Sequence, residues 1–197
     1  MNRFESIRLS TQRLEMIAAT REYLEAELED PERLASLLNA ELESGWPPGE
    51  YDREAQDLFL TRIREEGAAA AGWYSWYALH RVSPRHPMIG IGAGGYCGPP
   101  HEKEVEIGFS VMPLWRCQGY ASEIAAALTV NAFMDCRVDK VIAHTDPENA
   151  ASCRVLEKCR FTNVGRNEES GCYRFEILRN SRAHKELIRR IGKQHER

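Results

Sequence analysis

The spacing of hydrophobic residues predicts one strand and then two helices at the start of the chain. Hydrophobic residues alternate with polar ones over 14–18, as they do in a half-buried strand. Thr20 and Asp30 are typical N-cap residues, and they predict helices over 20–30 and 31–38. Proline at the first position of the second helix fits this reading, because its missing N–H is not needed there.

A third helix is expected at Arg53–Glu65, after a loop in which glycine and proline prevent helix formation. The loop is Gly45–Gly49, and its Trp46 is a candidate to close over a substrate. The helix would turn three hydrophobic residues inward, namely Leu58, Phe59 and Ile63.

Two changes of hydrophobic period define the rest of the chain. Aromatic-rich segments of period two predict strands, and a period of three and four after residue 120 predicts a long helix. The expected elements are strands at Trp73–Arg81, Met88–Cys97 and Val105–Met112, a helix at Gln118–Asp135, a strand at Lys140–Thr145, a helix around Ser152–Cys159, and strands at Phe161–Arg166 and Cys172–Leu178. The turn Ser83–Pro87 would join the first two strands of this series into a hairpin.

This order of elements predicts a single α/β (α+β) domain over residues 1–179. Its central sheet would be mixed and mostly antiparallel, with helices on both faces. The charged segment 180–197 is expected to be a mobile tail or a loosely docked helix. A length of 197 residues is enough for one well-filled domain and short for two.

Composition narrows the classes of function. A hydrophobic content of 43% and a charged content of 28% are ordinary for a globular protein, and the net charge of −4 argues against a general nucleic-acid binder. Met1–Glu5 lack the apolar core of a signal peptide, and no apolar run is long enough for a membrane span. The six cysteines form no CxxC pair and have no metal-ligand spacing to histidines. Reduced thiols, no metal and a cytoplasmic location are therefore expected.

The most informative stretch joins the strand Val105–Met112 to the long helix. Arg116 is followed by Gly119 and Ala121 where that helix should begin. The first N–H groups of a helix have no internal partner and the helix dipole adds positive charge, so this loop is suited to bind an anion. Small residues let the backbone approach a pyrophosphate, and Arg116 adds a charge. An ordinary strand-to-helix turn is the alternative.

Arg116-x-x-Gly119-x-Ala121 resembles the acyl-CoA pyrophosphate loop of the GNAT superfamily of N-acetyltransferases. The segment Asn149–Phe161 is similar to the branch of that superfamily that acetylates protein N-termini, including those of ribosomal proteins. The resemblance covers residues 8–178 and implies a GNAT-like fold, with acetyl-CoA as cosubstrate and no metal. The loop residues that it implies in cofactor binding are Arg116, Cys117, Gln118, Gly119, Tyr120, Ala121 and Ser122.

The resemblance also implies that two neighbouring parallel strands splay apart and hold the pantetheine arm of acyl-CoA. Here these would be Val105–Met112 and Lys140–Thr145. The contacts implied on the first strand are Phe109, Ser110 and Val111. Asn149 matches the family asparagine that hydrogen-bonds this arm, and it is equally suited to cap the helix that follows.

Acyl transfer requires a group that takes a proton from the amine, because a protonated amine cannot attack a thioester. Glu106 lies on the strand that would carry the pantetheine, where family members often place a carboxylate base. The alternative is a solvated or salt-bridged glutamate. Ser152 matches a serine proposed to lie near the CoA sulfur, where it would assist the departing thiolate. The alternative is a small helix residue that bonds its own backbone.

Two positions depart from the family pattern. Leu156 replaces the tyrosine acid that many members carry on the last helix, which leaves Ser152 or water to assist the thiolate. Arg160 stands where a glycine normally precedes the phenylalanine. If this position has the left-handed backbone of a helix end, Arg160 strains it by on the order of 1 kcal/mol.

The sequence therefore predicts direct acetyl transfer to an amine in a ternary complex. The acceptor would be a protein N-terminus or a small amine, with no nucleic acid or membrane as partner. A non-catalytic acyl-CoA-binding sensor or interaction module is the alternative from another class. A homodimer is expected only by analogy with similar enzymes.

Overall fold

The computed structural model describes residues 7–83, 85–168 and 170–195. Its strands are β1 (Arg8–Ser10), β2 (Leu14–Ala18), β3 (Ala40–Leu42), β4 (Ser75–His80), β5 (Met88–Tyr96), β6 (Glu104–Val111), β7 (Lys140–Thr145), β8 (Thr162–Arg166) and β9 (Tyr173–Leu178). Its helices are α1 (Arg21–Glu29), α2 (Pro31–Leu38), α3 (Arg53–Glu66), α4 (Tyr120–Ala132), α5 (Ala150–Lys158) and α6 (Arg182–His195). Short 3₁₀ turns occur at Ala68–Ala70 and Pro113–Trp115. The predictions for Met1–Glu5, for Pro84 in the hairpin turn and for the last two residues lie outside these ranges.

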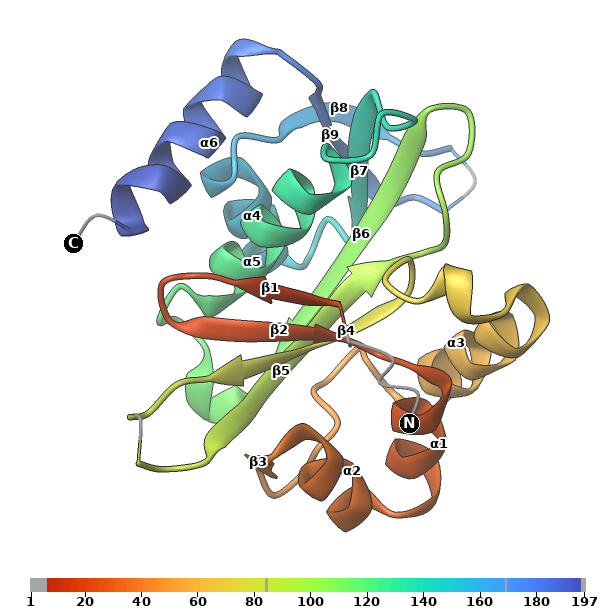
Figure 1. Cartoon of the computed structure of the whole chain (residues 1–197). Helices are drawn as coiled ribbons and strands as arrows, with labels where there is room; N and C mark the ends of the chain where they lie inside the picture. Colours follow the sequence, from red (N-terminus) through yellow and green to blue (C-terminus); the bar gives the residue numbers. More distant parts are fainter. Residues whose placement is uncertain (1–6, 84, 169, 196–197) are drawn as a thin grey trace.

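Within the described ranges the strands form one sheet in the order β1-β2-β4-β5-β6-β7-β9-β8, and β3 pairs with the start of β5. The pairs β3–β5 and β6–β7 are parallel, and the other neighbours are antiparallel. Helices cover both faces: α4 and α5 lie on one face and α1, α2 and α3 on the other (Figure 1). The predicted fold class is confirmed.

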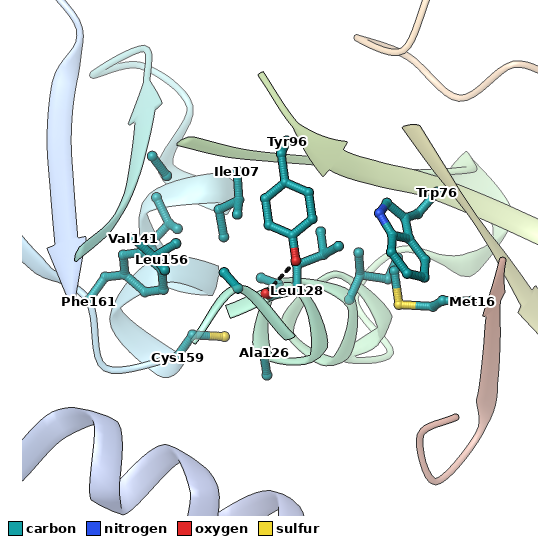
Figure 2. Packing of buried hydrophobic residues seen from close by; sticks show 14 of the residues in the cluster. Met16, Trp76, Tyr96, Ile107, Ala126, Leu128, Val141, Leu156, Cys159 and Phe161 are labelled. Carbon is teal, nitrogen blue, oxygen red and sulfur yellow. Dashed lines mark hydrogen bonds between the residues drawn. The ribbon is translucent and has the colours of Figure 1, made fainter. Parts of the chain in front are cut away.

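The larger core lies between the sheet and the helices α4 and α5. In Figure 2, Trp76 and Met16 flank α4 on one side, while Val141 and Phe161 lie toward α5. Tyr96 is buried beside α4, and its hydroxyl donates to the carbonyl of Leu128 at 2.7 Å, so its polar end is satisfied. This packing fixes α4, whose first residues follow the predicted anion-binding loop.

Two short strands and one helix boundary differ from the sequence prediction. β1 and β3 are three residues each, too short for a hydrophobic period to reveal them. α4 begins at Tyr120 rather than Gln118, because Gly119 takes a left-handed conformation with φ of 87° as its N-cap. The charged segment near the C-terminus forms α6, which is docked through the buried side chains of His184 and Leu187.

The inner face of α3 also differs from the prediction. Ile63 is buried and Phe59 is half-buried, but Leu58 is 52% exposed, so its predicted inward orientation is wrong. The inner face includes the buried Gln56 instead, whose Nε2 has no hydrogen-bond partner among the described residues. Hydrophobic spacing reveals neither this inward polar position nor the hydrogen-bond network of the neighbouring α1.

Glu27 is the centre of that network in the smaller core. It is only 5% exposed and accepts hydrogen bonds from Trp46 Nε1 at 2.7 Å, from the Tyr51 hydroxyl at 2.7 Å and from the Tyr77 hydroxyl at 2.8 Å. Burial raises the pKa of Glu27, and these donors partly offset the rise. Trp46, the sequence candidate to close over a substrate, is joined to α1 by its bond to Glu27, and its proposed role stays a prediction.

Arg160 ends α5 in the left-handed conformation, with φ of 69°. Its N–H donates to the Glu157 carbonyl, and the N–H of Phe161 donates to the Leu156 carbonyl at 3.0 Å. These bonds satisfy carbonyls at the end of the helix, and glycine usually occupies the left-handed position. The Arg160 side chain pairs with Glu186 of α6 at 3.5 Å but is 58% exposed, so the pair contributes little.

Replacing Arg160 with glycine should stabilise the fold. The left-handed conformation costs a non-glycine residue roughly 1–2 kcal/mol, while glycine adds about 0.5–1 kcal/mol of backbone entropy. The expected net gain is up to about 1 kcal/mol, or roughly 2–4 °C in melting temperature. Arg160→Ala is the control, because it removes the ion pair and keeps the strain. Equal melting temperatures for the two variants would show that strain is not the cause.

Candidate active site

The parallel neighbours β6 and β7 pair over only three residues each. The register is Glu104 with Lys140, Val105 with Val141, and Glu106 with Ile142. Beyond Glu106, β6 continues beside β5 and β7 continues beside β9, so the two strands separate. We call this separation the fork. It is the splayed pair of parallel strands that the family resemblance predicts, and Glu106 lies where it begins.

A cavity of 490 Å³ lies beside the open arm of β6, between the start of α4 and the start of α5. Most of the predicted site residues line it: Phe109, Ser110, Val111, Arg116, Cys117, Gly119, Tyr120, Ala121, Ser122, Asn149 and Ser152. Gln118 instead lines a neighbouring cavity of 450 Å³, which shares Gly119, Ser122 and Lys158 with the first. The fold therefore brings together residues from three separate parts of the sequence.

The loop before α4 presents a row of backbone donors. In the part of the chain that the structure describes, the N–H groups of residues 117–122 have no protein acceptor. Gly119 has its left-handed φ at the centre of this row, where a side chain would be strained. Arg116 donates through Nε to the Val111 carbonyl at 3.0 Å, which holds its charged group beside the loop. Open donors and the helix dipole together make this loop suited to hold an anion.

Arg13 supports this loop from behind, and the sequence analysis did not identify it. Its Nη1 donates to the Gln118 carbonyl at 3.0 Å, and its Nη2 pairs with Glu123 of α4 at 2.7 Å. Its guanidinium also lies 4.0 Å from the centre of the Tyr120 ring. The two segments are about a hundred residues apart in sequence, so no local motif could have linked them.

Asn149 and Ser152 lie on the opposite wall of the cavity, at the start of α5. Asn149 accepts through Oδ1 from the Ser152 N–H at 3.0 Å, so it caps the helix. Its Nδ2 lies 3.4 Å from Glu50 Oε1. Among the described residues the Ser152 hydroxyl has no bond to its own helix backbone, unlike that of Thr129, which donates to Ala125. Leu156 is fully buried in the larger core.

Glu106 lies apart from Ser152, in a cavity of 180 Å³ that also contains Cys97, His101 and Ile142. Its side chain is 32% exposed, and its Oε1 lies 2.9 Å from Nδ1 of His144 on β7. His144 and Glu106 are 38 residues apart in the sequence, so no local motif indicates a role for His144.

The other carboxylate on this face of β6 is already neutralised. Glu104 pairs with Arg174 at 3.0 Å and with Lys140 at 3.3 Å, and Lys140 also reaches Glu176 at 3.6 Å. Although burial opposes it, these two cations lower the pKa of Glu104. Glu106 differs from Glu104 because its hydrogen-bond partner is a histidine and no lysine or arginine pairs with it among the described residues.

The chain belongs to the GNAT acetyltransferase family, because residues 22–162 match the family model of the acetyltransferase (GNAT) domain. A stretch of 64 residues is 39% identical to an uncharacterized N-acetyltransferase, YnaD, of Bacillus subtilis (strain 168). That match covers 32% of this chain and 38% of the length of that curated relative.

Solved structures of acetyltransferases share the fold. A GNAT-family acetyltransferase from Bacillus anthracis has a TM-score of 0.57 at 20% identity, over 89% of this chain and all of the other. Mutant forms of the spermidine/spermine N-acetyltransferase SpeG from Vibrio cholerae have a TM-score of 0.57 at 16% identity, over 90% and 98% of the two chains. A ribosomal-protein alanine acetyltransferase from Vibrio fischeri has a TM-score of 0.59 at 13% identity, over 89% and 98%.

Cys97 beside Glu106 is predicted to react slowly as a nucleophile. Although its side chain is exposed along the small cavity, desolvation and then the charge of Glu106 raise the pKa of this thiol to about 11. The thiolate is the reactive form, and at pH 8 it would be about one part in a thousand. In iodoacetamide labelling read by mass spectrometry, Cys97 should react more slowly than the exposed Cys136, with a rate that rises through pH 10.

Glu106→Gln should accelerate Cys97 labelling at pH 8, since it removes one of the two causes of the raised pKa. Cys136 serves as the internal reference in both proteins. Equal rates for the two thiols in the wild-type protein would contradict the assigned environment of Cys97.

Proposed function

We propose that this protein transfers the acetyl group of acetyl-CoA to a primary amine by direct attack in a ternary complex. The observation that carries the proposal is the row of open N–H groups at residues 117–122, beside a fork between parallel strands. Family membership supports acetyl-CoA as the cosubstrate.

The residues around the fork fit acetyl-CoA. The open N–H groups and Arg116 would hold its diphosphate. The unpaired edge of β6 at Phe109–Val111, with Asn149 opposite, would hold the pantetheine arm. Bound acetyl-CoA supplies an acetyl group activated as a thioester, and no metal is needed for this chemistry.

Glu106 is the proposed base, acting directly or through a water molecule. The base takes one proton from the ammonium group, the amine nitrogen then attacks the acetyl carbon, and the carbon–sulfur bond breaks. The nitrogen loses a second proton as the amide forms, and the departing thiolate takes up a proton to leave as the CoA thiol. Ser152, with its hydroxyl on the cavity wall, would assist the departing thiolate. The raised pKa of Cys97 supports direct transfer, because the thiol beside the base is a poor acyl acceptor at neutral pH.

The proposed acceptor is a protein N-terminus or a small amine. The solved structures that share the fold include a spermidine/spermine N-acetyltransferase and a ribosomal-protein alanine acetyltransferase. All six cysteines are free, which supports the expected reducing, cytoplasmic location. No helix in the described ranges is long and apolar enough to cross a membrane. A homodimer stays a prediction by analogy.

Arg13→Ala should weaken acetyl-CoA binding by roughly tenfold, because the loop loses the bond that fixes the Gln118 carbonyl. Isothermal titration calorimetry with acetyl-CoA, CoA and ATP measures this. The wild-type protein should bind both CoA species and not ATP. Arg81→Ala is the matched control: Arg81 follows β4 opposite Arg13, and its side chain bonds Thr11 and Glu15, not the loop. Equal affinities for the two variants would contradict the role of Arg13, and a wild-type protein that binds neither CoA species would overturn the proposed function.

Glu106→Gln should lower kcat by about a hundredfold at neutral pH, since the amide cannot accept the proton. Acetyl-CoA affinity should change less than about twofold, as the base does not touch the diphosphate loop. The assay follows CoA release with peptide N-termini and polyamines as acceptors. Glu104→Gln is the control on the same strand face. An unchanged rate in Glu106→Gln would remove this residue as base, and CoA binding without transfer to any amine would favour the non-catalytic binding module.

A further inference from the structure

His144 and Glu106 meet across the start of the fork, one from each of its two strands. Glu106 is the last residue of β6 that pairs with β7, and His144 lies two residues beyond its partner Ile142. Their side chains lie on the same face of the sheet, with 2.9 Å between His144 Nδ1 and Glu106 Oε1. The bond therefore joins the two strands at the point where the backbone ladder ends.

The chemistry of this pair determines which nitrogen of the ring carries the hydrogen. An ionised carboxylate can only accept hydrogen bonds, so Nδ1 must be the donor. In the neutral ring, Nε2 is then a bare acceptor. This nitrogen is buried and has no hydrogen-bond partner among the described residues. Glu106 is thus the one polar contact that the structure records for the ring.

A buried nitrogen without a partner costs stability, and an apolar side chain of similar size would avoid that cost. A histidine at this position is therefore not explained by packing. It is explained by the hydrogen bond that its other nitrogen gives to Glu106. The nearby cations do not take the place of His144 as partners of Glu106, because Arg174 and Lys140 both form ion pairs with Glu104.

We propose that His144 is a positioning residue, whose Nδ1–H holds the Glu106 carboxylate at the start of the fork so that it faces the acceptor amine. This role rests on the proposed function, in which Glu106 is the base. A carboxylate that is one-third exposed would otherwise sample several rotamers, and a base that is misplaced by about 1 Å can lose up to a hundredfold in rate.

Two substitutions at His144 test the role. His144→Leu removes the donor and fills the same space, so kcat should fall by roughly tenfold to a hundredfold while the KM for acetyl-CoA stays within about twofold. Its melting temperature should be equal to or above that of the wild-type protein, because the unpartnered Nε2 is gone. His144→Asn keeps an amide N–H near the position of Nδ1 and should recover most of the lost rate.

A double-mutant cycle separates positioning from a general effect on the fold. If His144 acts through Glu106, His144→Leu should cost less than about threefold in the Glu106→Gln background. A full, additive loss in that background would overturn the proposal. So would a kcat for His144→Leu equal to wild type, or a kcat for His144→Asn as low as that for His144→Leu.

A second measurement does not depend on turnover. Long-range ¹H–¹⁵N correlation spectra of the free protein report the protonated nitrogen of each histidine, and the His144 signal is assigned by its loss in His144→Asn. A hydrogen on Nδ1 supports the proposal, and a neutral ring with its hydrogen on Nε2 overturns it. If the wild-type protein transfers acetyl to no amine, the proposed function fails and this role fails with it. If the wild-type protein is active and only Glu106 matters, this inference alone fails.

Discussion

The organisation of the site depends on the loss of backbone pairing between β6 and β7 after Glu106 and Ile142. Strands that run in parallel and then separate leave main-chain donors and acceptors without a partner, and buried groups of this kind need a ligand or water. β5 and β9 hold the outer edges of the two strands, so the separation is built into the sheet. The fork is therefore a stable feature of the fold.

Two consequences follow from the fork. Its open end meets the N-terminus of α4, which is fixed by the larger core and by Arg13, so a row of N–H groups faces the same cavity as the free edge of β6. Its closed end places Glu106 on one strand and His144 on the other, close enough to bond. The proposed anion binding and the proposed proton transfer thus lie at opposite ends of one structural feature.

Much of the fold could be predicted from the sequence, because its elements have clear local causes. Hydrophobic period located the long helices, and N-cap residues marked where two of them start. The sequence raised a left-handed conformation at Arg160 as one option for a helix end, and the structure has it. The predicted orientation of Leu58 was wrong, because Gln56 takes the inward position instead. The buried network around Glu27 joins residues from α1, β4 and a loop, so hydrophobic spacing could not reveal it.

The sequence by itself determined the family, the order of elements and the loop from Arg116 to Ala121, because these depend on neighbours in the chain. Only the tertiary structure decided which residues support that loop. It also decided which carboxylate of β6, Glu104 or Glu106, forms ion pairs with lysine and arginine. Arg13 reaches Gln118, and His144 reaches Glu106, through contacts between segments that are 105 and 38 residues apart. Such pairs are set by strand order and register, and no local pattern in the sequence records them.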